Sequence, residues 1–516
     1  MFGFFGLLNV MLDKNKFKKI GDNYRNNYSN KTLSRLIEVE PNTIIGYHKN
    51  KLKKNTDIIE NISLCLIGII NNYDELSNIL NIEIDNEDNY YEYIIYFYKK
   101  YGIEQTLNIV DGIYSFILFD KDNQKLYIIN DYIGIHNIYL YSDINNHYGI
   151  TTELKNINNL YNTINYDLYY NNEYNYKIVK FNSATYTIFN YDNNIDMWKL
   201  NKQNVKYHNF NSYRYLLNTF PLNINNMYSE MYNMLNVTLL KNNFNNDFAS
   251  LVLNGDIYSG VMCYLIHNIY KTKNKLKKLE IYSLTLNDYC DLKKSKLIAD
   301  FFKIKYKEIV VDETELINII NKVVYKLENY KLAKVRKGVE YYIIYDYIEN
   351  NSLSKNIINN FGSMELFGNN LENNDDTIIY DKEIRNNLNE IQYNNLFNLN
   401  NNFNIKSPYY DKIFINYYLS IHPSIRNNNI KSFVLRNCIN HIINDNNILK
   451  LFNKLNENNN NFINEFTIRI KKSISNHLKL NNIHNFKNSK YDALLSDIDE
   501  EKYYKEIYNK YYLYKN

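Results

Sequence analysis

Strand-like runs alternate with helix-like runs in the second half of the chain, and this alternation constrains the fold more than any other feature. The runs are LEIYSLTL (279–286), DLKKSKLIADFFKI (291–304), YKEIVV (306–311) and ETELINIINKVVYKLENY (313–330). Strands that alternate with helices favour a parallel sheet with helices on its faces. We therefore predict an α/β domain over residues 231–516, which includes a helical C-terminal extension.

Residues 1–190 carry a different pattern, in which short β-rich runs are bounded by Asn, Asp or Gly. These runs are LCLIGIINNY (64–73), YSFILFD (114–120), QKLYIIND (124–131) and NIYLYSD (137–143), and the apolar start MFGFFGLLNVML favours a first strand over a signal peptide. One helix is expected over residues 88–102, with Gly102 able to end it. The pattern predicts an α+β domain of layered, largely antiparallel sheets, joined to the second domain by a linker over 191–230.

The totals of the chain limit its function classes. A length of 516 residues predicts two or three domains. The 60 basic residues are nearly matched by 56 acidic ones, and no run approaches the length of a membrane span, so we expect neither a nucleic-acid nor a membrane partner. Cys65, Cys263, Cys290 and Cys438 lie far apart, which favours reduced, buried thiols over disulfides or a zinc site. These features predict a cytoplasmic protein.

The composition indicates the kind of genome more than it indicates function. Tyr occurs 54 times, while Gly occurs 14 times, Pro 4 times and Trp once. Tyr has A/T-rich codons, whereas Gly and Pro have G/C-rich ones. We interpret the bias as that of an A+T-rich genome, such as a giant virus or a parasite. The Asn-rich tracts are expected to be surface loops.

Two regions resemble known families. The segment 110–141 is similar to the end of the glutaminase domain in class II amidotransferases, and TTELKNI (151–157) resembles the SExK that follows it there. The matching residues are Asp111, Gly112, Phe116, Asp120, Asp131, Gly134 and Tyr139. Residues 291–330 and NFGSMELFGNN (360–370) resemble the ATP-dependent half of asparagine synthetases, and Glu365, Leu366, Phe367 and Gly368 match the end of its SGEGxDELFGG stretch. LVLNGDIYSG (251–260) falls where that family has LSGGLDSS.

This resemblance implies a fold and two reactions. The first domain is expected to have the Ntn-type layered sheets of class II amidotransferases, and the second the parallel sheet of the ATP-pyrophosphatase (adenine nucleotide alpha hydrolase-like) type. In that family an N-terminal Cys hydrolyses glutamine. ATP, with Mg²⁺, then adenylates aspartate, and ammonia displaces AMP.

The first domain departs from the family at the positions that carry its chemistry. The former glutaminase positions are Phe2, Asn50, Ile67, Gly68, Ile69 and Tyr90. Phe2 stands in place of the nucleophile, and of the oxyanion-stabilising NGE run only Gly68 remains. Losing one oxyanion donor typically costs about 100- to 1000-fold in rate, and losing the nucleophile removes the mechanism.

The second domain departs in the same way. In the loop, Asp256 replaces a Gly and Tyr258 replaces an Asp, and a carboxylate at the first position repels a phosphate. Phe361 stands in place of the Glu credited with proton transfer. Met364 replaces a metal-ligating Asp, and a thioether is a poor ligand for Mg²⁺.

Other positions of the second domain keep some family character. The residual nucleotide-binding positions are Leu253, Gly255, Ser259, Leu284, Asn359 and Asn360, and the possible residual functional residues are Arg336, Glu365 and Lys454. For Arg336 and Lys454 a surface or salt-bridged role is at least as plausible as ligand binding, and Ser259 fits a helix cap. We expect no catalytic residue and no metal site.

Two functional readings remain open. The first is a catalytically impaired relative of asparagine synthetases that keeps a binding or structural role, with a homodimer or an intact relative as partner, and requires no cofactor. The alternative is an active ATP-dependent asparagine synthase or amide ligase that uses aspartate, ATP and glutamine or ammonia.

Overall fold

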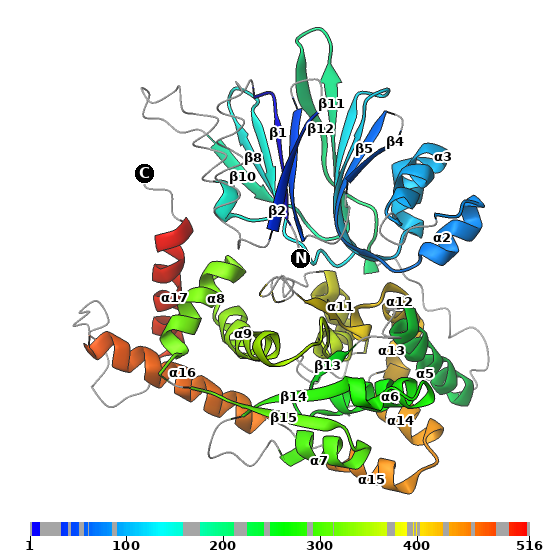
Figure 1. Ribbon diagram of the computed structural model, residues 1–516, viewed down its shortest axis with the longest axis vertical. Coiled ribbons are helices and arrows are strands. Elements are labelled where there is room, and N and C mark those ends of the chain that lie inside the picture. Colours follow the sequence, from blue (N-terminus) through cyan, green and yellow to red (C-terminus); the bar gives the residue numbers. More distant parts are fainter. Residues whose placement is uncertain are drawn as a thin grey trace. The chain divides into compact units, whose positions relative to one another are not determined.

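The computed structural model describes residues 3–10, 32–39, 43–50, 56–59, 61–84, 90–157, 176–210, 224–241, 248–285, 293–312, 314–368, 377–389, 396, 399, 403–426, 433–455, 460–480 and 495–512. The chain divides into two compact units (Figure 1). The first comprises residues 1–209, 389–395 and 514–516, and the second comprises residues 210–388 and 396–513.

Two antiparallel sheets form the first unit. One has the strand order β10-β8-β9-β1-β3-β2, and the other β12-β11-β7-β6-β5-β4. The strands are β1 (Phe4–Leu8), β2 (Thr32–Val39), β3 (Thr43–Asn50), β4 (Thr56–Ile59), β5 (Ile62–Ile70), β6 (Gly112–Asp120), β7 (Lys125–Asn130), β8 (Tyr139–Asp143), β9 (Tyr148–Thr151), β10 (Tyr176–Lys180), β11 (Thr185–Asp192) and β12 (Met197–Lys206). Two helices, α2 (Tyr73–Leu80) and α3 (Glu92–Ile109), accompany them.

Strand β5 shows why these sheets form layers. Successive side chains of a strand point to opposite faces. Cys65 and Ile67 belong to the core shared with the other sheet, whereas Leu64 and Leu66 belong to the core under α2 and α3. Both faces of β5 are therefore covered, so its sequence is apolar almost throughout. The predicted α+β fold with layered antiparallel sheets is confirmed.

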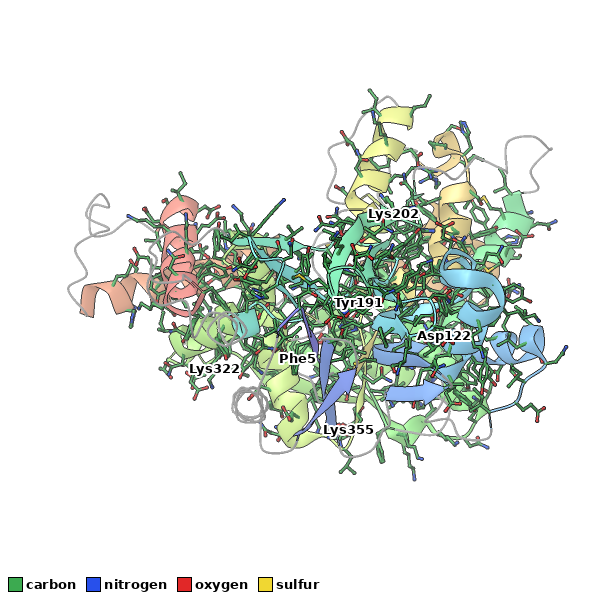
Figure 2. All side chains as sticks on the ribbon, turned by 90° about the horizontal axis from the view of Figure 1, so that it is seen from above. Phe5, Asp122, Tyr191, Lys202, Lys322 and Lys355 are labelled. Atoms are coloured by element: carbon green, nitrogen blue, oxygen red, sulfur yellow. The ribbon has the colours of Figure 1, made fainter. Side chains whose placement is uncertain are left out.

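The structure of the first unit differs from the sequence prediction at the end of one helix and at the end of the unit. The helix expected to end at Gly102 has a break there (φ 77°) and then continues to Ile109. The first unit also runs to residue 209, past the boundary predicted at 190, because β12 pairs with β11 and completes the sheet. Figure 2 labels Tyr191 on β11 and Lys202 on β12, both within the range expected to be linker.

A parallel sheet organises the second unit, with the order β15-β14-β13-β16-β17. The strands are β13 (Ala249–Val252), β14 (Leu279–Thr285), β15 (Lys305–Val310), β16 (Asn356–Ile358) and β17 (Asn404–Lys406). The helices are α5 (Ile224–Lys241), α6 (Ile257–Thr272), η4 (Leu276–Lys278), α7 (Lys293–Phe302), α8 (Leu316–Leu327), α9 (Leu332–Asn351), α10 (Ser363–Leu366), α11 (Thr377–Asn389), η7 (Pro408–Tyr410), α12 (Lys412–Ser420), α13 (Pro423–Arg426), α14 (Phe433–Ile442), α15 (Asn446–Leu455), α16 (Asn460–Leu480) and α17 (Asp497–Tyr512). The predicted parallel sheet with helices is confirmed.

Two further sequence expectations concern thiols and membrane spans. Cys65, Cys263 and Cys438 are free and buried, while Cys290 lies outside the described residues. Burial raises the pKa of each described thiol, which keeps it protonated. Within the described ranges, no helix combines the length and the apolar character that crossing a membrane requires.

Candidate functional site

The candidate site lies at the carboxyl ends of β13 and β16, where ligands bind in open parallel sheets. After β13 the chain passes through Leu253 and Asn254 to Gly255, whose φ of 75° is available at low cost only to glycine. Asp256 follows in an extended conformation and is the N-cap of α6. This strand, turn and helix have the layout of a phosphate-binding loop.

A carboxylate of the chain itself occupies the helix start. Asp256 Oδ1 accepts a hydrogen bond from the Ser259 amide (2.7 Å), and Oδ2 accepts one from Asn360 Nδ2 (2.9 Å). Burial raises the pKa of Asp256, and the hydrogen bond from the Ser259 amide opposes that rise. The N–H group that would contact an anion therefore already has an anionic partner, which is also tied to the loop after β16.

The next residue of interest in the loop, Tyr258, belongs to an aromatic core. Its ring stacks on Phe367 with centroids 5.3 Å apart, and Tyr409 meets it edge-on at 6.1 Å. Tyr409 also donates a hydrogen bond from its hydroxyl to the Tyr258 carbonyl (3.0 Å). The space of a small carboxylate in the related synthetases is thus filled by packed rings.

The short helix α10 carries the positions that correspond to acid–base and metal-binding residues in the family. Phe361, just before it, packs on Tyr341 with centroids 4.5 Å apart. Met364 is 36% exposed. Burial raises the pKa of Glu365, and the positive charge of Lys337 opposes that rise. Of these three side chains only Glu365 carries a carboxyl group, so they form no pair of carboxylates.

Lys337 and Tyr341, on α9, are site residues that the sequence interpretation missed. Lys337 Nζ lies 3.0 Å from Glu340 Oε2 and 5.0 Å from the centroid of the Tyr341 ring. The charge of Lys337 also acts on Asp256 and Glu365, whose pKa values it lowers against the larger effect of burial. No helix was predicted over these residues, so the i, i+4 spacing of Lys337 and Tyr341 did not indicate a shared helix face.

The residual nucleotide-binding positions are occupied by internal contacts. Leu253 and Leu284 are 2% and 4% exposed, and the Leu253 carbonyl accepts a hydrogen bond from Ser283 Oγ (2.6 Å). Asn359 is fully buried and accepts from the Phe361 amide at 3.2 Å. These side chains meet at one sheet edge, but they serve the packing of that edge.

Arg336 lies on α9 and Lys454 on α15 of the second unit. Arg336 donates to Glu500 from Nε (3.0 Å) and Nη2 (2.6 Å), and Nη2 also contacts Asp497 of α17 at 2.7 Å. Lys454 is an exposed residue of α15. The structure thus places Arg336 in a salt bridge with the C-terminal helix.

Two positions of the candidate site offer no side-chain oxygen to a Mg²⁺ ion bound with a nucleoside triphosphate. Magnesium needs several hard oxygen ligands at about 2.0–2.1 Å, and the side chains of Phe361 and Met364 provide none. In the part of the chain that the structure describes, no cluster of three or more His, Cys, Asp or Glu residues could hold a metal ion.

The former glutaminase positions in the first unit are also filled by structural contacts. Ile67 is 1% exposed in the core, and Ile69 is 42% exposed. Gly68 has a φ of 106°, and a Cβ built on it lies 2.0 Å from the carbonyl oxygen of Ile113. Gly68 is therefore required by the close approach of β5 and β6, independently of any oxyanion.

The remaining glutaminase positions are placed as follows. Tyr90 stacks on Tyr73 with centroids 4.1 Å apart. Asn50 is the last residue of β3, although its side chain is not described, and Phe2 lies outside the described residues.

The retained amidotransferase motif forms a turn after β7. Asp131 accepts hydrogen bonds from the amides of Ile133 (2.8 Å), Gly134 (2.6 Å) and Ile135 (3.2 Å). Burial raises the pKa of Asp131 to about 7, and these hydrogen bonds oppose the rise. The motif residues present in the chain therefore stabilise the turn.

His136, the next residue in this turn, is expected to make the stability of the fold depend on pH. It is 2% exposed, its Nε2 has no hydrogen-bond partner among the described residues, and burial lowers its pKa to about 3. Because the unfolded state then binds a proton that the folded state does not, stability is full above about pH 6.5 and falls as the pH drops. At pH 5.0 this loss is about 2 kcal/mol.

The test compares the wild type with His136→Leu in urea at pH 7.5 and 5.0, followed by the fluorescence of Trp198, the only tryptophan of the chain. The variant should lose about 2 kcal/mol less than the wild type on acidification. Asp131 contributes with the opposite sign, since its raised pKa stabilises the fold on acidification, but it contributes equally to both proteins. An identical pH dependence of the two proteins would contradict the prediction.

Comparison with known proteins identifies the class of the first unit. Residues 55–159 match the family model described as a glutamine amidotransferase domain. Residues 55–159 are therefore similar to a glutamine amidotransferase domain, and they lie within the unit of layered antiparallel sheets.

Comparison of the longer sequence identifies the relatives. The chain is 23% identical over 308 residues to the glutamine-hydrolysing asparagine synthetase of Bos taurus (59% of this chain, 53% of the relative) and 23% identical over 337 residues to that of Homo sapiens (64% and 57%). A solved glutamine phosphoribosylpyrophosphate amidotransferase from B. subtilis covers 60% of this chain and 65% of its own at 10% identity, with a TM-score of 0.29, too low to compare the folds. The chain is thus similar, at low identity, to glutamine-hydrolysing asparagine synthetases, and it spans about half the length of the curated relatives it matches.

Proposed function

We propose that this protein is a catalytically impaired relative of asparagine synthetases that acts by binding. The observation that carries the proposal is the Asp256 carboxylate, which takes the hydrogen bond of the Ser259 amide at the start of α6. At about 5 Å and an effective dielectric constant near 20, this charge repels a bound phosphate by about 3 kcal/mol. An exposed helix terminus contributes only about 0.3–1 kcal/mol in the opposite direction.

We expect MgATP to bind with a millimolar dissociation constant or not at all, as measured by isothermal titration calorimetry. Asp256→Gly is the matched variant, because it removes the repelling charge but leaves Tyr258 and Met364 in place. It should bind MgATP up to about 100-fold more tightly than the wild type, which is the factor that about 3 kcal/mol corresponds to. A micromolar dissociation constant for the wild type would refute the proposal.

Activity assays test the same proposal. Glutamine should release no glutamate above the background of the heat-unfolded protein. A mixture of protein, ATP, Mg²⁺, aspartate and ammonia should form no AMP and pyrophosphate. Turnover in the second mixture would establish the alternative, an ATP-dependent amide ligase that uses free ammonia.

The binding role is assigned to the protein surface, with a second copy of the chain or an intact asparagine synthetase as the expected partner. The support is that Gly68 and the Tyr258 ring, which stand where the resemblance places catalytic groups, serve the fold. Light scattering after size-exclusion chromatography, alone and with an intact relative, is the measurement, and a strict monomer in both cases would count against this role.

A further inference from the structure

The amino ends of the parallel strands in the second unit gather lysines. Because parallel strands share one direction, the segments that enter them meet at one edge of the sheet, opposite the candidate site. Residues 271–278 lead into β14, Lys303 precedes β15, and Lys355 precedes β16. The lysine edge consists of Lys271, Lys273, Lys275, Lys277, Lys278, Lys303, Lys305 and Lys355.

Contacts between side chains show that these segments adjoin. Lys278 Nζ lies 5.8 Å from the centroid of the Phe248 ring, and the Phe248 carbonyl accepts a hydrogen bond from Ser354 Oγ at 2.9 Å. Ser352 Oγ donates to Glu280 Oε2 at 3.2 Å. The segments before β13, β14 and β16 are thus held together at this edge.

An apolar side chain is held in solvent between the two serines. Leu353 is 78% exposed, while Ser352 and Ser354 on either side of it are fixed by the contacts above. Phe248 and Phe301, which is near the end of α7, are 36% and 39% exposed. The lysine edge therefore combines positive charge with projecting apolar groups.

Among the described residues of this edge, lysines outnumber acidic side chains. Glu280 contacts both Lys305 (2.6 Å) and Lys307 (3.9 Å). Asp300 and Glu349 are the other acidic residues at the same ends of α7 and α9. The net charge of +4 averages this edge with the rest of the chain, which is why composition predicted no membrane partner.

We propose that the lysine edge binds the surface of an anionic lipid bilayer, with Leu353 entering the headgroup region. Each lysine near such a surface contributes favourably, and an inserted apolar side chain adds to the binding. Lysines are flexible point charges, which suit a diffuse anionic surface better than a fixed array of carboxylates. The phosphate backbone of a nucleic acid would leave Leu353 without an apolar partner.

Vesicle cosedimentation tests the proposal on the full-length protein without nucleotide. We expect at least tenfold stronger binding to vesicles of phosphatidylcholine and phosphatidylserine (70:30) than to phosphatidylcholine alone, with weaker binding in 0.5 M NaCl. Replacement of Lys271, Lys277 and Lys355 by glutamine should reduce binding at least tenfold. Replacement of Leu353 by serine should reduce it about fivefold without changing its salt dependence.

A matched control replaces Lys322, Lys382 and Lys472, which are exposed lysines of other elements, by glutamine. Figure 2 labels Lys322 and Lys355, one from each set. The control should bind within twofold of the wild type. Equal losses in both triple variants, no preference for phosphatidylserine, or stronger binding to heparin or duplex DNA than to the vesicles would each overturn the proposal.

Discussion

Gly68→Ala should destabilise the first unit by about 3 kcal/mol or more, which corresponds to a fall of about 10 °C in its unfolding temperature. Two effects act together. The φ of 106° is unfavourable for alanine, and the new Cβ would lie 2.0 Å from the Ile113 carbonyl oxygen and 2.8 Å from Tyr114 Cα. Both contacts are with backbone of the paired strand, so no side-chain rotation can relieve them.

Gly102→Ala is the matched control for this substitution. Gly102 also has a positive φ (77°), but nothing lies within 4 Å of its Cβ position. Its cost should be limited to the conformational strain of φ 77° with ψ 174°, about 1–3 kcal/mol. Thermal unfolding followed by Trp198 fluorescence separates the two variants. Equal stability losses would show that the close approach of β5 and β6 does not set the requirement for glycine.

Asp381→Ala should destabilise the second unit by about 3–5 kcal/mol. Asp381 is 2% exposed and pairs with Arg385 (Nε to Oδ2, 2.7 Å) and with Arg426 Nη2. Both guanidinium groups are 5% exposed or less as side chains. Removing the carboxylate leaves two buried positive charges without their shared counter-ion.

The measurement is hydrogen exchange of α12, whose Leu419 carbonyl accepts a hydrogen bond from Arg385 at 2.9 Å. Glu501→Ala is the control, because its pair with Lys331 (3.0 Å) is far more exposed and should contribute less than about 1 kcal/mol. Protection of α12 that falls no further in Asp381→Ala than in the control would contradict the assignment of a buried charge cluster.

The spacing of apolar residues along the sequence was sufficient to predict the fold class of both units. Apolar runs on β5 and β14 are bounded by polar residues, and the helices between the strands of the second unit carry apolar faces, so local patterns agree with the global fold. The end of the first unit, predicted at residue 190, was harder to predict from the sequence. β12 is a strand with many exposed polar residues, and its sequence resembles a linker until its pairing with β11 is known.

The candidate site was predictable as a set of positions but not as a set of contacts. The sequence indicates that Asp256 would repel an anion, yet it does not show that Ser259 and Asn360 hold this carboxylate. The contact with Asn360 joins residues 104 positions apart, which no local pattern can reveal. The lysine edge escapes prediction for a similar reason, because its segments meet only in the parallel sheet.

The contact between Asp256 and Asn360 couples the start of α6 to the loop after β16. A glycine at position 256 would remove the cap of α6 and the 2.9 Å partner of the Asn360 amide in one step. Replacement of a helix cap by glycine costs only about a few tenths of a kcal/mol, to which the loss of the Asn360 contact adds. An open helix start would also require the Tyr258 ring to leave its stack with Phe367. Each of these changes destabilises the protein by itself, so selection for stability favours the present loop over one with an open helix start.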